Sequence, residues 1–287
     1  MFKKIRLIMF PVIIFCILVS LCGILKLLLQ QSKSAANDIV SVQSGQSLDT
    51  EGYTEPLYSL VITTKCESIE IYSSDETVSE AFDLYIDEKL SDSDQYITDN
   101  GYEYLINYGK PSGDLKIVLN STSSFGDITV EAPAADVNIT GIEARELKIN
   151  NNAGFTGCSG VISDSIIISS QNGSVNVSDS ESTVTKVSSQ NGNVFINSTS
   201  REFYITCVSG DIGFVPVDMG LRADLTTVSG DIDTKFGEDD GITVYIKQNG
   251  GMRTVKDVFA GNDNRYVKGD GYSVINISTD TGNITIE

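Results

Sequence analysis

The sequence predicts an all-β fold, a repetitive β-solenoid-like stack of coils of about 19 to 20 residues, preceded by one N-terminal transmembrane helix. Three observations support this fold class. The composition combines 25 Gly with many Ser, Thr and Asn residues between short β-branched runs, which is typical of strands joined by turns. Glycines recur at a nearly constant interval in the second half of the chain. One long apolar run lies near the N-terminus.

The N-terminal segment predicts a membrane anchor. Residues 1–6 are basic, and residues 7–29 carry no charge except Lys26, a length of apolar sequence that crosses a bilayer as a helix. A cleaved signal peptide has a shorter apolar core, and the small-residue site at 34–36 lies well past this run, so we expect the anchor to stay uncleaved. The basic residues favour an N-terminus inside the cell. We therefore predict a single-pass protein of the cell membrane, with a cytoplasmic tail over 1–6, a transmembrane helix over 7–29 in the lipid bilayer, and an extracytoplasmic β domain.

Two further segments follow the anchor. Residues 30–56 are polar and poor in large apolar side chains, so they predict a linker. Residues 57–287 predict the β-strand-repeat domain. Its first part contains short runs in which apolar and polar residues alternate, the pattern of half-buried strands. These runs are 57–63, 68–72, 81–86, 102–108 and 115–119.

A glycine repeat organises the rest of the domain. The glycines recur at spacings of about 18 to 21 residues, and a last one follows after a longer interval. They are Gly154, Gly173, Gly192, Gly210, Gly230, Gly251 and Gly282. The position five residues before the best-defined glycines is always apolar, with Ile168, Val187, Ile205, Leu225 and Ile277. The position directly after them is always polar, with Ser174, Asn193, Asp211, Asp231 and Asn283.

Each repeat predicts a strand, a glycine bend and a second strand. Glycine permits positive φ at the bend, and the Asp, Asn or Ser that follows can hydrogen-bond backbone groups that the bend leaves unpaired. A unit of about twenty residues has one apolar face and cannot bury it alone, so the units must stack. Residues 257–272 interrupt the series, and we expect the final unit to cap the stack. Half-matches at Gly113 and Gly126 indicate that the repeats begin before residue 130.

The Val-Ser-Gly-Asp-Ile sequence at 208–212 and 228–232, with variants at 190–194 and 282–284, resembles the motif of a bacterial "putative adhesin" family of unknown function. That family is built from β-strand repeats, and the resemblance covers roughly residues 57–287. It implies a surface or envelope protein that is often anchored in the membrane at its N-terminus. It implies no catalytic residues.

Ser209 and Asp211 of this motif raise the hypothesis of a nucleophile with an acidic partner. A nucleophilic serine needs a base within hydrogen-bond reach, and the sequence contains no His. Sister repeats replace Asp211 by asparagine or serine, which a turn tolerates and catalysis does not. We therefore predict no enzymatic activity, no catalytic residue and no cofactor. The remote alternative is a β-helical polysaccharide-active enzyme with Asp211 and Asp231 as paired carboxylates on adjacent coils.

Aligned Asp and Asn oxygens at turns also suit calcium, and residues 238–240 and 262–264 could add ligands. Neither segment matches a complete calcium loop, so solvated acidic turns are the favoured interpretation and we predict no metal site. Beyond the anchor, Cys66, Cys158 and Cys207 show no metal-binding spacing. We expect them to be buried as small apolar side chains, with one disulfide among them as the open alternative.

These observations predict a membrane-anchored cell-surface or envelope protein whose β-repeat ectodomain has a structural or adhesive role. A net charge of -19 would repel the phosphate backbone, which excludes nucleic acid as a partner. A surface glycan, a matrix component or a membrane protein remains as the partner. The alternative function is an envelope sensor or regulatory module that works through a membrane partner, because the predicted tail over 1–6 is too short to signal alone.

Overall fold

The computed structural model describes residues 58–287, except for 75–80, 91–94, 122–124, 238–240 and 263. The described residues form strands β1 to β23 and no α-helix, which confirms the all-β prediction. They belong to a compact unit that spans Glu55–Glu287. None of the elements described is a helix long and apolar enough to cross a membrane. The predicted tail, membrane helix and linker over 1–56 lie outside the described residues.

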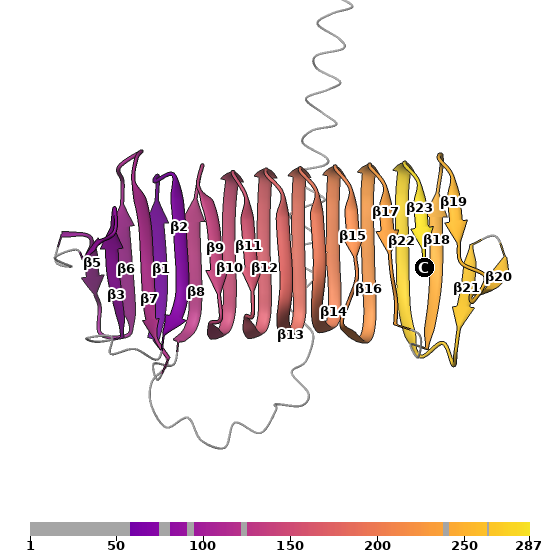
Figure 1. The fold of residues 1–287 in the computed structure, drawn as a ribbon, viewed down its shortest axis with the longest axis horizontal. Coiled ribbons are helices and arrows are strands. Elements are labelled where there is room, and N and C mark those ends of the chain that lie inside the picture. Colours follow the sequence, from indigo (N-terminus) through magenta and orange to yellow (C-terminus); the bar gives the residue numbers. More distant parts are fainter. Residues whose placement is uncertain (1–57, 75–80, 91–94, 122–124, 238–240, 263) are drawn as a thin grey trace, which may run out of the picture. The chain divides into compact units, whose positions relative to one another are not determined.

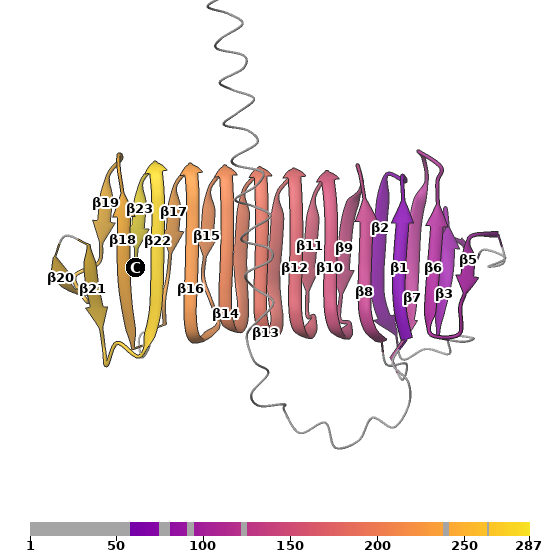
Figure 2. The same ribbon diagram turned by 180° about the vertical axis from the view of Figure 1, so that it is seen from behind.

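The strands form two faces of a regular stack, which we call face A and face B (Figures 1 and 2). In the body of the stack each coil adds one strand to each face, and neighbouring strands pair in parallel. β13 (Val175–Asn191) and β14 (Val194–Ser209) run over both faces, beginning on face B and ending on face A. In spatial order the other strands of face A are β6 (Glu103–Tyr108), β1 (Tyr58–Thr64), β8 (Phe125–Ala132), β10 (Glu143–Ala153), β12 (Ile162–Asn172), β16 (Asp218–Ser229), β22 (Ser273–Thr281) and β18 (Ile242–Gln248). Those of face B are β7 (Asp114–Asn120), β2 (Ser68–Ser74), β9 (Asp136–Thr140), β11 (Thr156–Ser159), β15 (Ile212–Phe214), β17 (Ile232–Thr234), β23 (Ile284–Ile286) and β19 (Arg253–Val255).

The core lies between the two faces and consists of aligned apolar side chains. The predicted apolar position five residues before the glycine forms one such row, because each member is the register partner of the next. All members of this row are buried, as the alternation requires. Towards the end of the stack, aromatic rings of successive coils meet edge to face. Phe203 contacts Phe214 at 5.0 Å between ring centroids, and Phe214 contacts Phe236 at 6.3 Å.

The order of the coils in space differs from their order in the chain at both ends (Figure 1). β1 pairs with β6 on one side and β8 on the other, so the first coil lies inside the stack. β22 likewise pairs with β16 and β18, so the last coil is inserted between two earlier ones. The prediction that the final unit caps the stack is therefore wrong. The chain leaves a one-coil gap after β17, builds the outer coil with β18 and β19, and returns to fill the gap.

Antiparallel strands from internal segments close the two ends of the stack. At one end, β3 (Phe82–Ile86) pairs with β7, β4 (Lys89–Leu90) pairs with β3, and β5 (Ile97–Asp99) pairs with β6. At the other end, β21 (Arg265–Lys268) pairs with β18 and with β20 (Ala260–Asn262). The interruption at 257–272 supplies this second cap. The antiparallel strands cover the outer edges of β6, β7 and β18, which would otherwise be open to pairing with another sheet, whereas β19 pairs with β23 alone among the described strands.

Candidate functional site

The glycine of the repeated motif stands in a column where neighbouring coils approach closely. A Cβ built on Gly230 would lie 2.0 Å from the carbonyl oxygen of Gly210, and one on Gly210 would lie 2.5 Å from that of Gly192. Only glycine fits such an approach. Positive φ, the reason expected from the sequence, does not hold for Gly230, whereas Gly210 has φ of +153°. The close approach of neighbouring backbones, and not a positive φ, is therefore the common reason why glycine recurs in this column.

From Gly192 onward along the repeat, the residue after the glycine ties one coil to the next. Asn193 accepts a hydrogen bond through Oδ1 from the backbone N–H of Asp211 at 2.9 Å. Asp211 accepts one from the N–H of Asp231 at 2.8 Å, and Asp231 accepts one from that of Asn283 at 2.7 Å. The predicted turn role of these side chains is confirmed. Asparagine and aspartate share the column because each offers a side-chain oxygen.

The hypothesis of a Ser209–Asp211 catalytic pair finds no support in the geometry. Ser209 is exposed, and its hydroxyl makes no hydrogen bond with the described part of the chain. One carboxylate oxygen of Asp211 is already bound to a backbone N–H of the next coil. Within the part of the chain that the structure describes, neither side chain contacts a general base, which a serine nucleophile requires.

We expect Asp211→Ala to lower the free energy of unfolding by about 1 kcal/mol, because the N–H of Asp231 then loses its acceptor. Asp211→Asn keeps a side-chain oxygen at the same place and should cost less than half as much. Urea unfolding of both variants beside the wild-type chain measures the difference. Equal destabilisation by the two substitutions would show that charge, and not the acceptor oxygen, is what the column needs.

A second column of small polar side chains lies beneath the bend and donates to the glycine carbonyls. Ser189 donates to the carbonyl oxygen of Gly192 at 3.1 Å, and Thr227 donates to that of Gly210 at 3.2 Å. Cys207 occupies the same column and its thiol donates to Gly192 at 3.3 Å. The Cys207 thiol thus takes the place of the Ser or Thr hydroxyl at this position of the column, and it is also small enough for the tight bend.

The three cysteines of the described region are free and buried, as predicted, and the disulfide alternative is not realised. Burial is the main cause that raises the pKa of the Cys66 and Cys207 thiols. Cys158 is 1% exposed, and burial raises its pKa to about 12. A thiol must ionise to act as a nucleophile or bind a metal, so burial and the raised pKa both disfavour these roles for the three cysteines in the folded protein.

The Cys158 thiol should therefore resist alkylation by a maleimide at pH 8 in the native protein and react within minutes in concentrated urea. Peptide-level mass spectrometry separates Cys158 from the other cysteines. The unfolded sample is the control for intrinsic reactivity. Labelling of Cys158 at similar rates with and without urea would mean that its coil opens readily.

The calcium candidates do not assemble into a site in the described residues. Residues 238–240 and 263 lie outside them, so the structure does not place those predicted ligands. Elsewhere in the described chain, no group of three or more acidic, cysteine or histidine side chains could hold a metal ion. The turn aspartates bond to backbone N–H groups instead.

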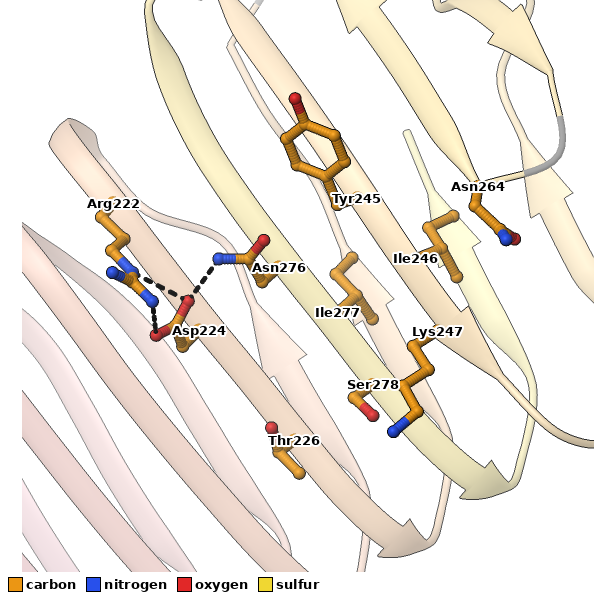
Figure 3. Close-up of a pocket in the computed structure, with 10 residues that line it drawn as sticks. All are labelled: Arg222, Asp224, Thr226, Tyr245, Ile246, Lys247, Asn264, Asn276, Ile277 and Ser278. Carbon is orange, nitrogen blue, oxygen red and sulfur yellow. Dashed lines mark hydrogen bonds and ion pairs between the residues drawn. The ribbon is translucent and has the colours of Figure 1, made fainter. Parts of the chain in front are cut away.

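The structure reveals an open groove on the outer side of face A, over β16, β22 and β18, with a volume of about 440 Å³. Asn276 and Ser278 of the inserted strand β22 lie along its middle (Figure 3). Arg222, Asp224 and Thr226 of β16 stand on one side. Tyr245 and Lys247 of β18 stand on the other, and Asn264 adds a further polar residue. The buried Ile246 and Ile277 complete the lining.

Polar contacts fix one side of this groove. Arg222 and Asp224 form an ion pair at 2.6 Å, and this hydrogen-bonded partner raises the pKa of Arg222. The side-chain amide of Asn276 donates to Asp224 at 2.7 Å (Figure 3). The Arg222 guanidinium also lies 5.9 Å from the ring centroid of Tyr204, within the range of a cation–π contact.

Sequence reasoning missed the groove because its two sides come from strands that are not consecutive. Asp224 and Asn276 are register partners, and Asn276 pairs in turn with Tyr245, although the three are far apart in the chain. The repeat shows which positions point outward in each coil. It does not show that the last coil lies between β16 and β18, so the combination of side chains could not be foreseen.

Comparisons with known proteins place the chain in a family. No curated protein matches it. A crystal structure from Clostridium sporogenes ATCC 15579, named a "putative cell adhesion protein", is 12% identical, with 80% of this chain and 92% of that chain covered and a TM-score of 0.26. A crystal structure from Bacteroides fragilis NCTC 9343, named a "putative adhesin", is 13% identical, with 80% and 93% covered and a TM-score of 0.42. The family model Toastrack DUF4097 matches residues 32–287, which is most of the chain, and the chain therefore belongs to the Toastrack DUF4097 family.

Proposed function

We propose that this chain is a membrane-anchored cell-surface or envelope protein whose β stack binds other molecules and performs no catalysis. The observation that carries the proposal is the open groove on face A. It lies on strands held in continuous register, and the side chains of Tyr245 and Lys247 make no hydrogen bond or ion pair with other described residues. Uncommitted polar and aromatic groups on a rigid surface suit recognition.

The use of the repeated aspartates supports the non-catalytic part of the proposal. Paired carboxylates on adjacent coils would be the acid and base of a polysaccharide-active enzyme. Asp211 and Asp231 instead each accept a backbone hydrogen bond that joins neighbouring coils. An activity on a polysaccharide panel that Asp211→Ala abolishes without unfolding the protein would overturn this part.

The anchored location rests on the sequence of residues 7–29, which predicts a helix across the membrane. Protease shaving of intact cells tests it. We expect peptides from residues 58–287 to be released without cell lysis, while a cytoplasmic marker protein stays intact. Release of these peptides only after lysis would contradict an extracytoplasmic domain.

Binding is tested with the full-length chain, captured in detergent micelles, against arrays of glycans, matrix proteins and envelope fractions. Retention of a glycan or matrix component supports an adhesive role. If affinity purification recovers only a membrane-embedded regulatory protein, the sensor alternative replaces adhesion. If none of these binds, the recognition function is wrong.

A further inference from the structure

We propose that the groove over β16, β22 and β18 binds a short saccharide that carries a carboxylate. This inference rests on the proposed binding function and names its ligand class. The site comprises Tyr245, Lys247, Asn276 and Ser278, with the Arg222–Asp224 pair opposite. Its volume of about 440 Å³ lies within the range of small-ligand sites. Arg265 lies outside the lining, on β21, which pairs with β18 on the side away from β22.

Charge in the groove favours an anion. Asp224 is compensated, because it binds Arg222 at 2.6 Å and Asn276 at 2.7 Å. Lys247 has no acidic partner among the described residues. The nearby acid Asp280, two residues beyond Ser278 on β22, accepts a hydrogen bond from the side chain of Asn249 at 2.8 Å. The side chains lining the groove therefore keep one uncompensated positive charge in a chain whose net charge is -19.

A second cation stands beside the exposed tyrosine. Arg265 of β21 is the register partner of Tyr245, and paired residues of antiparallel strands point to the same side of a sheet. Arg265 is exposed and forms no ion pair with the described chain. Lys247 lies two residues along β18 from Tyr245, also on the outer side. Two ammonium or guanidinium groups near one ring provide charge-assisted hydrogen bonds for a carboxylate.

The remaining groups suit a polyhydroxylated ring. Tyr245 is 44% exposed and offers an aromatic face with a hydroxyl at its end, which combines apolar contact with hydrogen bonding. Ser278 and Thr226 present hydroxyls that can donate and accept. Asn276 uses its amide N–H on Asp224, which leaves its side-chain oxygen as an acceptor. Polar groups and apolar surface thus lie side by side in the groove, and a sugar ring, with its hydroxyls and its C–H face, matches both better than a wholly apolar ligand does.

The test measures binding of a galacturonic acid trisaccharide to the full-length chain in detergent micelles by calorimetry and saturation-transfer NMR. The methyl-esterified trisaccharide, which lacks the charges, is the matched ligand. We expect the acidic form to bind about tenfold more tightly. Similar affinity for both forms, or binding of neither, would overturn the inference.

Variants locate the site on the protein. Lys247→Ala and Tyr245→Ala should each weaken binding of the acidic trisaccharide about tenfold, and Lys247→Arg should restore most of it. Lys148→Ala, on the outer side of face A but outside the groove, is the control and should bind as the wild-type chain does. Unchanged affinity in the Lys247 and Tyr245 variants would place the ligand elsewhere.

The same variants separate the groove from the general binding function. If the wild-type chain adheres to the glycan and matrix arrays and the groove variants adhere equally, the groove inference fails and the binding function stands. If the wild-type chain adheres to nothing, the proposed function fails as well. Loss of adhesion in the groove variants alone supports both.

Discussion

Replacing Gly230 by alanine is expected to lower the free energy of unfolding by about 3 kcal/mol, one of the largest effects of any single methyl group in this domain. The new Cβ would lie 2.0 Å from the carbonyl oxygen of Gly210. That oxygen cannot retreat freely, because it accepts a hydrogen bond from Thr227 at 3.2 Å. The coils on both sides would have to separate, and every hydrogen bond between them would stretch.

Gly109→Ala is the matched control, since a Cβ at that position meets no atom within 4 Å. We expect its urea midpoint to stay close to that of the wild-type chain or to rise slightly, because alanine restricts the unfolded chain. Circular dichroism at a β-strand wavelength follows both variants. A Gly230→Ala protein as stable as Gly109→Ala would show that the coils are not in close contact at this column.

Much of the fold can be predicted from the sequence because one coil repeats the chemistry of the next. Ile205 and Leu225 are apolar for the same reason, and each stands five residues before a glycine that a neighbouring backbone touches. The alternation of apolar and polar side chains predicts the strands, and the interval between glycines predicts the length of a coil. The hydrogen bonds of Asp211 and Asp231 also follow from their place after the bend.

The order of coils is harder to predict, because the repeat makes them interchangeable. The row that contains Leu225 accepts Ile277 as its next member as readily as Ile246, and both are apolar and β-branched. Nothing in the spacing shows that the chain skips one position after β17 and fills it last. The longer interval before Gly282 is visible in the sequence, but a cap and an insertion explain it equally well.

The groove could not be predicted for the same reason, because the sequence does not show which coils are neighbours. The glycine column shows a related limit of prediction from sequence. Tyr245 and Asp224 belong to one site only because β22 lies between their strands. For Gly230 the sequence predicts a glycine-dependent bend, yet the distance to the next coil, and not its φ angle, imposes the residue. Contacts between coils depend on how the coils are stacked, so they cannot be predicted from the sequence of a single coil.

Ile277→Ala in the last coil is expected to cost about 3 kcal/mol, as much as the same change in the middle of the stack. Ile277 is 1% exposed, and its strand is hydrogen-bonded on both sides by β16 and β18. Ile205→Ala is the matched control, because Ile205 is also 1% exposed and occupies the same row of the core. Urea unfolding should give equal shifts of the midpoint, whereas a terminal coil at an open end would fray and make Ile277→Ala nearly silent.

Removing residues 273–287 should have a still larger effect and prevent the domain from folding as a unit. The truncated chain would leave β16 and β18 without the strand that joins them, with two parallel edges exposed across an apolar gap. The row of Leu225 and Ile246 would lose the side chain of Ile277 from between them. We expect aggregation on expression and loss of the cooperative transition, measured by size-exclusion chromatography and circular dichroism. A chain end that packs inside a stack cannot be removed without a loss of stability. A truncated protein that stays monomeric and keeps the wild-type midpoint would therefore mean that the last coil is not an integral part of the stack.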